Sequence, residues 1–222
     1  HPCSVVFGIA KEGDKIAGGG IADAEDRRVL GDVAERIGEH PAQVAMIGFM
    51  RRFDPSYARA KQALVEGKLG KLFHIACASH DPVDPEGFFV RFAPTSGGIF
   101  LDCCIHDIDL VRWMLDGAKA VNTSSAGTRV MYPALNACGD VDNAFATIIF
   151  DGGIVATFHV SRTSHSGYEA SMILNGTHGG LRIGQNISRQ PLFYEVNGKR
   201  QAEGQVDFFE RFGDAFLCEA KA

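Results

Sequence analysis

The chain has 222 residues, of which 45% are hydrophobic and 22% charged, so its composition is that of an ordinary globular protein with enough apolar material for a core. Its formal net charge of −5 argues against general nucleic-acid binding, which requires a basic face. No apolar run approaches the roughly 20 residues of a membrane span, so no membrane association is expected. Six cysteines without CxxC spacing indicate reduced thiols, and a cytoplasmic location is therefore predicted.

The first 42 residues predict a degenerate βα segment in front of the main domain. A short apolar run at 4–10 predicts a strand, and a loop rich in glycine and charge follows it. Apolar residues at helical spacing then run from about 23 to 38. We therefore expect a division into residues 1–42 and a larger α+β domain at 43–222.

The elements predicted in residues 43–222 mix helices with strands, and the second half is rich in strands. In chain order they are strand 43–49, helix 57–66, strand 72–79, helix 100–115, strands 143–150 and 154–160, strands 168–175, 181–183 and 192–196, and helix 206–220. An Asp-Gly turn joins the strands 143–150 and 154–160 into a hairpin. The predicted fold class is α+β, with an open, mostly antiparallel sheet and helices on one face.

The predicted helix 100–115, preceded by two glycines, is the most informative segment. At about 100° per residue, one stripe of this helix holds polar and aromatic residues while nearly all other positions are apolar; the stripe consists of Asp102, His106, Asp109 and Trp113. A carboxylate one turn before an imidazole can hold the ring in one tautomer and raise its basicity, which suits general acid/base chemistry. The alternative is an Asp-His pair that only caps or cross-links the helix. The glycines would let a ligand approach the helix N-terminus.

The segment from Gly97 to Asp109 resembles the GG-x-x-x-D-x-x-x-H-D-x-D motif of Gfo/Idh/MocA oxidoreductases, particularly the inositol 2-dehydrogenases. Three further stretches are similar to family segments and occur in the family's order; they are 44–57, 66–71, and Ser161-Arg162 followed by 167–169. The resemblance implies that the Asp and His of the motif contact substrate hydroxyls and that the His is the acid/base of hydride transfer. These roles carry over to Asp102 and His106.

The resemblance also suggests further site residues. Arg162 and Tyr168 match positions on the sheet near the substrate, and Asp109 and Trp113 share the stripe of His106 and are predicted to bind substrate. Lys15 stands about where a lysine of the family's Glu-Lys-Pro motif falls, although a solvated loop lysine is the simpler interpretation.

His159 is a further candidate for substrate binding. It lies on the polar side of its predicted strand together with Thr157, from which it could reach the cleft. An exposed or inter-strand histidine is the alternative. A metal site at His106, Asp107 and Asp109 is not expected, because adjacent helical residues diverge and no HxxxH or CxxC spacing is present.

The family's nucleotide-binding G-x-G-x-x-G turn is absent from the sequence. The glycines at 8–13 and 17–23 do not have its spacing, so no cofactor is expected. NAD(P) is expected only if the chain is an oxidoreductase, which is one of the alternatives below. The main function predicted is a cofactor-independent acid/base enzyme, a cyclase, isomerase or lyase acting on a small oxygenated metabolite.

Two alternative functions stay open. One is an NAD(P)-dependent oxidoreductase of the inositol dehydrogenase type whose cofactor domain is missing or supplied by another chain. The other is a non-catalytic association domain. The resemblance implies a homodimer or higher homo-oligomer formed through the sheet, and the expected partners otherwise are a small-molecule substrate and no nucleic acid.

Overall fold

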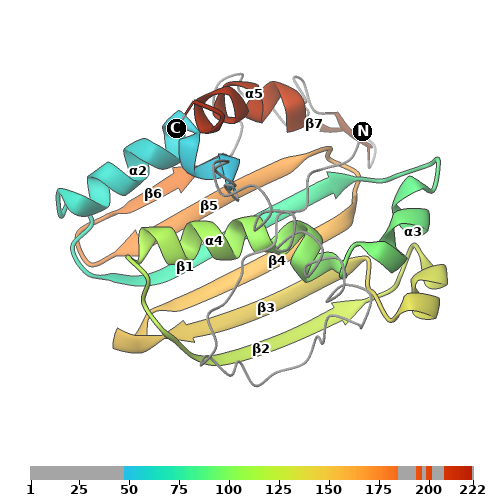
Figure 1. The fold of residues 1–222 in the computed structure, drawn as a ribbon, viewed down its shortest axis with the longest axis horizontal. Coiled ribbons are helices and arrows are strands. Elements are labelled where there is room, and N and C mark those ends of the chain that lie inside the picture. The colour runs from blue at the N-terminus through green and yellow to red at the C-terminus, as the bar shows by residue number, and fades with distance from the viewer. Residues whose placement is uncertain (1–47, 185–193, 197–198, 202–207, 222) are drawn as a thin grey trace, which may run out of the picture. The chain divides into compact units, whose positions relative to one another are not determined.

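The computed structural model describes residues 48–184, 194–196, 199–201 and 208–221 (Figure 1). From Phe49 onward these residues belong to one compact unit. Lys15, the βα segment predicted at 1–42 and nearly all of the strand predicted at 43–49 lie outside the described residues. The division at residue 43 therefore stays a prediction.

Six strands form one open mixed sheet in the order β2-β3-β4-β1-β5-β6. The strands are β1 (Leu72–Pro82), β2 (Ala120–Thr128), β3 (Asn143–Phe150), β4 (Val155–Ser164), β5 (Glu169–Gly176) and β6 (Gly180–Ile183). Only β1 and β4 pair in parallel, so the predicted open and mostly antiparallel sheet is confirmed. Because β1 and β4 are parallel, their carboxyl ends lie side by side at the same end of the strands. Two short strands, β7 (Tyr194–Val196) and β8 (Lys199–Gln201), pair separately.

Three helices, α2 (Pro55–Val65), α4 (Ile105–Met114) and α5 (Phe208–Glu219), lie on one face of the sheet (Figure 1). The shorter helical segments are η1 (Met50–Phe53), α3 (Phe88–Phe92), η2 (Ala93–Thr95), η3 (Phe100–Cys104), η4 (Pro133–Cys138) and η5 (Asp151–Gly153). Within the described residues, no single helix has the length and apolar character to cross a membrane. The pair Phe88–Thr95 and Phe100–Met114 meets that test only when combined, and it is bent by 87°.

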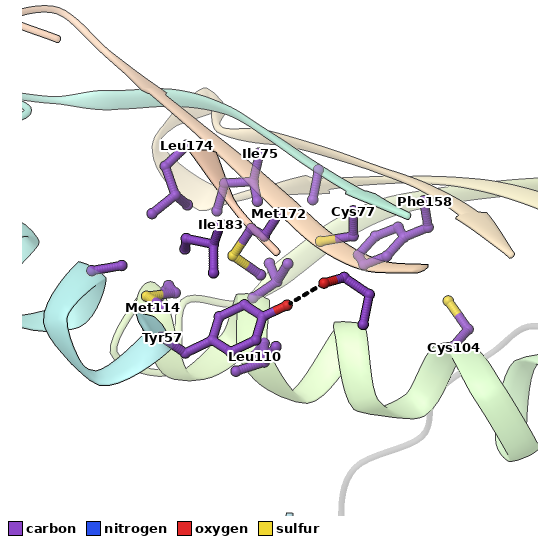
Figure 2. Close-up of a cluster of buried hydrophobic side chains, with 14 of the residues drawn as sticks. Tyr57, Ile75, Cys77, Cys104, Leu110, Met114, Phe158, Met172, Leu174 and Ile183 are labelled. Carbon is purple, nitrogen blue, oxygen red and sulfur yellow. Dashed lines mark hydrogen bonds between the residues drawn. The ribbon is translucent and has the colours of Figure 1, made fainter. Parts of the chain in front are cut away.

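The core lies between α4 and the central strands of the sheet (Figure 2). Side chains alternate along a strand, so every second residue of β1 points toward the helices, beginning with Ile75 and Cys77. Met172 and Leu174 of β5 pack beside them, fully buried. The hydroxyl of Tyr57, also fully buried, donates a hydrogen bond of 3.3 Å to the carbonyl oxygen of Ala170. This bond gives the buried phenol a polar partner.

The structure differs from the sequence expectation at β2 and in the helix predicted at 100–115. β2 was not predicted because its sequence is small and polar and has no alternation, and all its residues are exposed. It forms a strand through pairing with β3 at the sheet edge.

The helix predicted at 100–115 is two segments, since η3 is a π-helix and only Ile105–Met114 is α-helical. A π-helical turn bonds residue i to i+5, which changes the angular phase between residues on either side of it.

Asp54 connects the start of α2 to α5. Its Oδ1 atom accepts hydrogen bonds from the backbone N–H of Ser56 at 2.9 Å and of Tyr57 at 3.2 Å, which caps α2. Its Oδ2 atom is paired with the guanidinium of Arg211 on α5. This one buried carboxylate therefore links α2 to α5, although Asp54 and Arg211 are 157 positions apart in the sequence.

Replacing Asp54 with alanine should lower the free energy of unfolding by about 1–2 kcal/mol through the lost cap, with a further loss from the unpaired Arg211. Asp54→Asn keeps an oxygen acceptor for the cap and should lose less. Urea denaturation measures both. Ser56→Ala is the control, because only the backbone of Ser56 takes part, and it should stay within about 0.5 kcal/mol of the wild type. Equal losses in Asp54→Ala and Ser56→Ala would contradict the capping role.

Candidate active site

Asp81 and Arg162 lie near the carboxyl ends of the parallel strands β1 and β4. Asp102, on η3, lies at the same end of these strands. Arg162 donates a hydrogen bond of 3.0 Å from Nη1 to Oδ2 of Asp81, and its Nη2 atom forms an ion pair with Asp102. The guanidinium also lies over the ring of Phe89, 4.2 Å from the ring centroid. Arg162 thus links two carboxylates from different elements and has a fixed orientation.

His106 lies in the first turn of α4, shortly after Asp102 in the sequence. Its ring meets that of Phe49 edge to face, with centroids 6.1 Å apart, and its buried Nδ1 atom has no hydrogen-bond partner among residues 48–184, 194–196, 199–201 and 208–221. Burial, and secondarily the positive charge of Arg51, lowers the pKa of His106 to about 3. The imidazole is therefore uncharged at neutral pH, and its Nδ1 atom is not used by any group in the described part of the chain.

Arg51 and Asp107 form a buried ion pair behind His106. Nη1 of Arg51 donates to Oδ1 of Asp107 at 2.7 Å and to the hydroxyl of Ser79 at 3.0 Å, and both charged side chains are almost completely buried. Neither residue was predicted from the sequence to belong to the site. The available signal was an aspartate within an otherwise apolar helix, which needs a buried partner.

Tyr168 precedes β5 and lies near Arg51. Its ring packs edge to face against Phe208 and Phe212 of α5. Burial raises the pKa of Tyr168 to about 12, and the charge of Arg51 opposes this shift. The phenol therefore stays protonated and keeps its capacity to donate a hydrogen bond.

The structure corrects the expected pairing of Asp102 with His106. The Asp102 carboxylate is paired with Arg162, and the pKa of His106 is lowered and not raised. The helical wheel failed here because Asp102 lies in the π-helical η3 while His106 lies in α4. The change of phase at Cys104 separates two residues that an uninterrupted α-helix would place on one stripe.

The glycine loop before η3 does not offer the ligand approach that the sequence suggested. The backbone N–H of Ile99 donates to Oδ1 of Asp140 at 3.0 Å, and that of Gly98 donates to the hydroxyl of Ser96 at 3.1 Å. A Cβ atom at Gly98 would lie 3.4 Å from the Asp140 side chain, so the loop packs closely against a carboxylate. A dinucleotide pyrophosphate needs free N–H groups, and this helix start does not fit one.

The other two residues of the predicted stripe have structural partners. Asp109 accepts a hydrogen bond of 2.8 Å from Nε of Arg52, and it is buried. Trp113 packs against the core cluster, and its backbone carbonyl accepts a bond of 3.0 Å from Nζ of Lys61. The structure therefore does not bring Asp109 or Trp113 together with Asp102 and His106 in a shared polar contact.

His159 points to the opposite face of the sheet from α4. Its Nδ1 atom is 3.0 Å from Nε2 of His80, and its ring stacks on Phe145 at a centroid distance of 4.5 Å. Residues of β4 alternate, and the neighbours Phe158 and Val160 are the ones buried toward the helices. His159 therefore cannot reach the cluster around His106, and the predicted access to the cleft is not found.

The sequence matches the GFO/IDH/MocA C-terminal domain over residues 57–182, which is more than half of the chain. The chain belongs to this family. It is 35% identical over 176 residues to a scyllo-inositol 2-dehydrogenase (NAD(+)) of Bacillus subtilis, covering 79% of this chain and 50% of that protein. The chain thus spans about half the length of the curated relatives that it matches.

Two solved structures show the same fold at similar identity. A myo-inositol 2-dehydrogenase from Lactobacillus plantarum has a TM-score of 0.75 and 30% identity, with 90% of this chain and 58% of that chain covered. A scyllo-inositol dehydrogenase from Lactobacillus casei, solved with NAD(H) and scyllo-inositol, has a TM-score of 0.71 and 33% identity, with coverages of 89% and 57%.

These relatives overturn two predictions made from the sequence. A cofactor-independent cyclase, isomerase or lyase is contradicted as the main function, because the relatives are NAD-dependent inositol dehydrogenases. The expectation of no cofactor is contradicted for the same reason. Both errors came from giving the missing G-x-G-x-x-G turn too much weight in a sequence that covers only about half of such a protein.

The depressed pKa of His106 predicts a specific dependence of stability on pH. The unfolded chain binds a proton at this residue near pH 6.5, whereas the folded chain resists it down to about pH 3. The contribution of His106 to the free energy of unfolding is therefore lost as pH falls below 6.5, at up to about 1.4 kcal/mol per pH unit.

Chemical denaturation of the wild type and His106→Gln between pH 7.5 and 4.5 measures this effect. The wild type should lose more stability than the variant over this range, since glutamine does not titrate. His178→Gln, at an exposed histidine, serves as the control and should follow the wild type. Parallel curves for the wild type and His106→Gln would show that His106 protonates as easily in the folded protein as in the unfolded one.

Proposed function

We propose that this chain supplies the substrate-binding and proton-transferring part of an NAD-dependent dehydrogenase that oxidises inositol or a similar neutral polyol. Two observations carry the proposal: the uncharged His106, whose Nδ1 atom has no hydrogen-bond partner among the described residues, and the Asp102–Arg162–Asp81 cluster, whose Asp102 precedes His106 by one helical turn in the sequence. The names of the relatives supply the reaction class and the substrate class.

In this proposal, His106 accepts the proton of the reacting hydroxyl, for which a neutral imidazole is required. Asp102 and Arg162 bind neighbouring hydroxyls, with the carboxylate accepting and the guanidinium donating hydrogen bonds. Tyr168 donates a further hydrogen bond as a protonated phenol. Lys15 remains a proposed participant by its place in the sequence alone.

A bound nicotinamide nucleotide would supply the hydride acceptor. The glycine turn before η3 does not fit the nucleotide phosphates, because the backbone N–H groups of Gly98 and Ile99 are occupied by Ser96 and Asp140. We therefore assign nucleotide binding to residues outside the described ones or to another chain.

The charges at the cluster favour an uncharged substrate. Asp81 and Asp102 contribute two negative charges against the one positive charge of Arg162, and Arg51 is neutralised by Asp107. A phosphate or carboxylate on the substrate would meet a net negative cluster and be repelled. A polyol has no such penalty and offers several hydroxyls for the same groups.

We also propose that the protein acts in the cytoplasm and that two copies associate through the sheet face opposite α4. No described helix covers this face. Phe145 and Ile149 of β3 lie on it, and 46% and 37% of their respective surfaces are exposed to solvent. Exposed aromatic and branched side chains on a flat sheet are suited to association with a similar surface.

The activity test is oxidation of scyllo-inositol and myo-inositol with NAD⁺, followed by NADH absorbance. His106→Gln should lower kcat/KM by about 10²–10⁴-fold because the proton acceptor is lost. Asp102→Asn should mainly raise KM if it binds a hydroxyl. His178→Gln, remote from the cluster, should match the wild type. The proposal is rejected if the wild type, assayed together with the segment or chain that binds the nucleotide, oxidises no cyclitol, or if His106→Gln keeps full activity.

The association test compares Phe145→Asp with Phe88→Asp by light scattering coupled to size-exclusion chromatography. Phe145→Asp places a charge on the uncovered sheet face and should reduce the mass from dimer or higher to monomer. Phe88 is 58% exposed on α3, so its substitution changes surface charge equally without altering the sheet face. A monomeric wild type, or an unchanged mass in Phe145→Asp, would rule out this surface.

A further inference from the structure

Phe89 presents its ring to the guanidinium of Arg162, whose central carbon lies 4.2 Å from the ring centroid. Phe89 is only 4% exposed, so its contact with the charge is shielded from water. A guanidinium over an aromatic face is attracted by the ring, and more strongly away from solvent. Phe89 belongs to a small buried cluster with Ala93 and Leu135, which is separate from the main core between the helices and the sheet.

Asp84 and Tyr132 fix the position of Phe89. The backbone N–H of Phe89 donates a hydrogen bond of 2.7 Å to Oδ2 of Asp84, in the loop before α3. The ring of Tyr132 packs edge to face against that of Phe89, with centroids 5.8 Å apart. The Tyr132 hydroxyl accepts a hydrogen bond of 2.9 Å from the backbone N–H of Asp84, so the two supports are also bonded to each other.

Asp142 connects these supports to the strand that carries Arg162. Its carbonyl oxygen accepts a hydrogen bond of 2.9 Å from the backbone N–H of Arg162. Its buried carboxylate accepts bonds from the backbone N–H groups of Met131 at 2.7 Å and Tyr132 at 3.0 Å. The contacts therefore close a circuit that begins at the Arg162 backbone and returns, through Tyr132 and Phe89, to its guanidinium.

The ring restricts the guanidinium in a way that its two carboxylates do not. Asp81 and Asp102 contact N–H groups at the edge of the guanidinium, and the side chain of Asp81 is 34% exposed. Ion pairs in contact with water hold long side chains only weakly. An aromatic ring against the central carbon of Arg162 adds a contact that is independent of the N–H groups, because the flat guanidinium also stacks on aromatic faces.

We propose that Phe89 is a positioning residue for Arg162: its ring holds the guanidinium in the orientation in which it donates hydrogen bonds to a neutral polyol. Phe89 acts through Arg162 and not on the substrate directly. The inference rests on the proposed function and adds an aromatic support, built from the segments around α3 and η4, to the polyol site.

The first readout is the ¹⁵N{¹H} NOE of the Arg162 Nε–H group in the full chain, which reports picosecond-to-nanosecond motion of the guanidinium. Arg162→Gln assigns the signal. Phe89→Leu keeps an apolar side chain but removes the ring, so the NOE should fall. Replacing Phe89 with pentafluorophenylalanine keeps a ring of similar shape but reverses its quadrupole, and the NOE should fall as well. Phe88→Leu is the matched control, because Phe88 lies on the same helix but stacks on Phe92, and it should leave the NOE unchanged.

The second readout is the kinetics of scyllo-inositol oxidation, assayed together with the segment or chain that binds the nucleotide. Both changes at Phe89 should raise KM by about 3- to 10-fold, the range of a buried cation–π contact. They should leave kcat nearly unchanged, because substrate binding is weakened while the proton acceptor is untouched. A partly unfolded variant would instead show a lower kcat at an unchanged KM.

Three results would overturn the inference. They are a wild-type NOE in the pentafluorophenylalanine variant, a fall in Phe88→Leu as large as in Phe89→Leu, and an unchanged KM in both Phe89 variants. The fluorinated variant keeps the volume of the ring and decides the matter if Phe89→Leu does not fold.

The NOE does not depend on turnover, so the two proposals fail separately. An inactive wild type with the expected NOE changes would reject the dehydrogenase proposal and leave Phe89 as the residue that orders Arg162. An active enzyme whose NOE is the same in the wild type and both Phe89 variants would reject only the role of Phe89.

Discussion

The buried guanidinium of Arg51 contacts side chains from three elements other than its own. It comes from η1, binds Asp107 of α4 and Ser79 of β1, and lies against Phe212 of α5. Breaking a buried pair by removing one partner typically costs about 3–5 kcal/mol, because the remaining charge is left without compensation. This pair therefore helps to hold α4 on the sheet, together with the Arg52–Asp109 pair and the apolar residues of α4 in the core.

The sheet separates His106 from His80 and His159, which lie on its other face. Toward α4, His106 is uncharged and has an unused nitrogen. On the other face, His80 bridges Glu169 and His159, and the hydrogen bond from His80 is the main reason that the pKa of Glu169 is lowered. The strict alternation of side chains along β1 and β4 decides which histidine meets which neighbours. His80, Glu169 and His159 therefore form a network of paired polar groups on that face.

Much of the fold could be predicted from local patterns. The alternation in β3 and β4 and the Asp-Gly turn gave a hairpin that the structure contains, with β4 continuing to Ser164. The apolar spacing around Leu110 and Met114 gave a buried helix. β2 could not be predicted because its exposed, small and polar residues carry no periodic signal, and its strand conformation depends on pairing with β3. The π-helical turn at 100–104 also could not be predicted, because the apolar spacing of this segment is that of an ordinary α-helix.

The sequence by itself determined the types of most elements, the family, and the selection of Asp102 and His106 as candidates, because periodicity and motif spacing are local properties of the chain. Only the tertiary structure decided the partners of these residues. Arg162 reaches Asp81 across 81 positions, and Arg51 reaches Asp107 across 56, because the parallel pairing of β1 with β4 and the packing of α4 bring distant segments together. The protonation state of His106 follows from that assembly, since burial and a charge from another element set it, and neither is written in the residues adjacent to it.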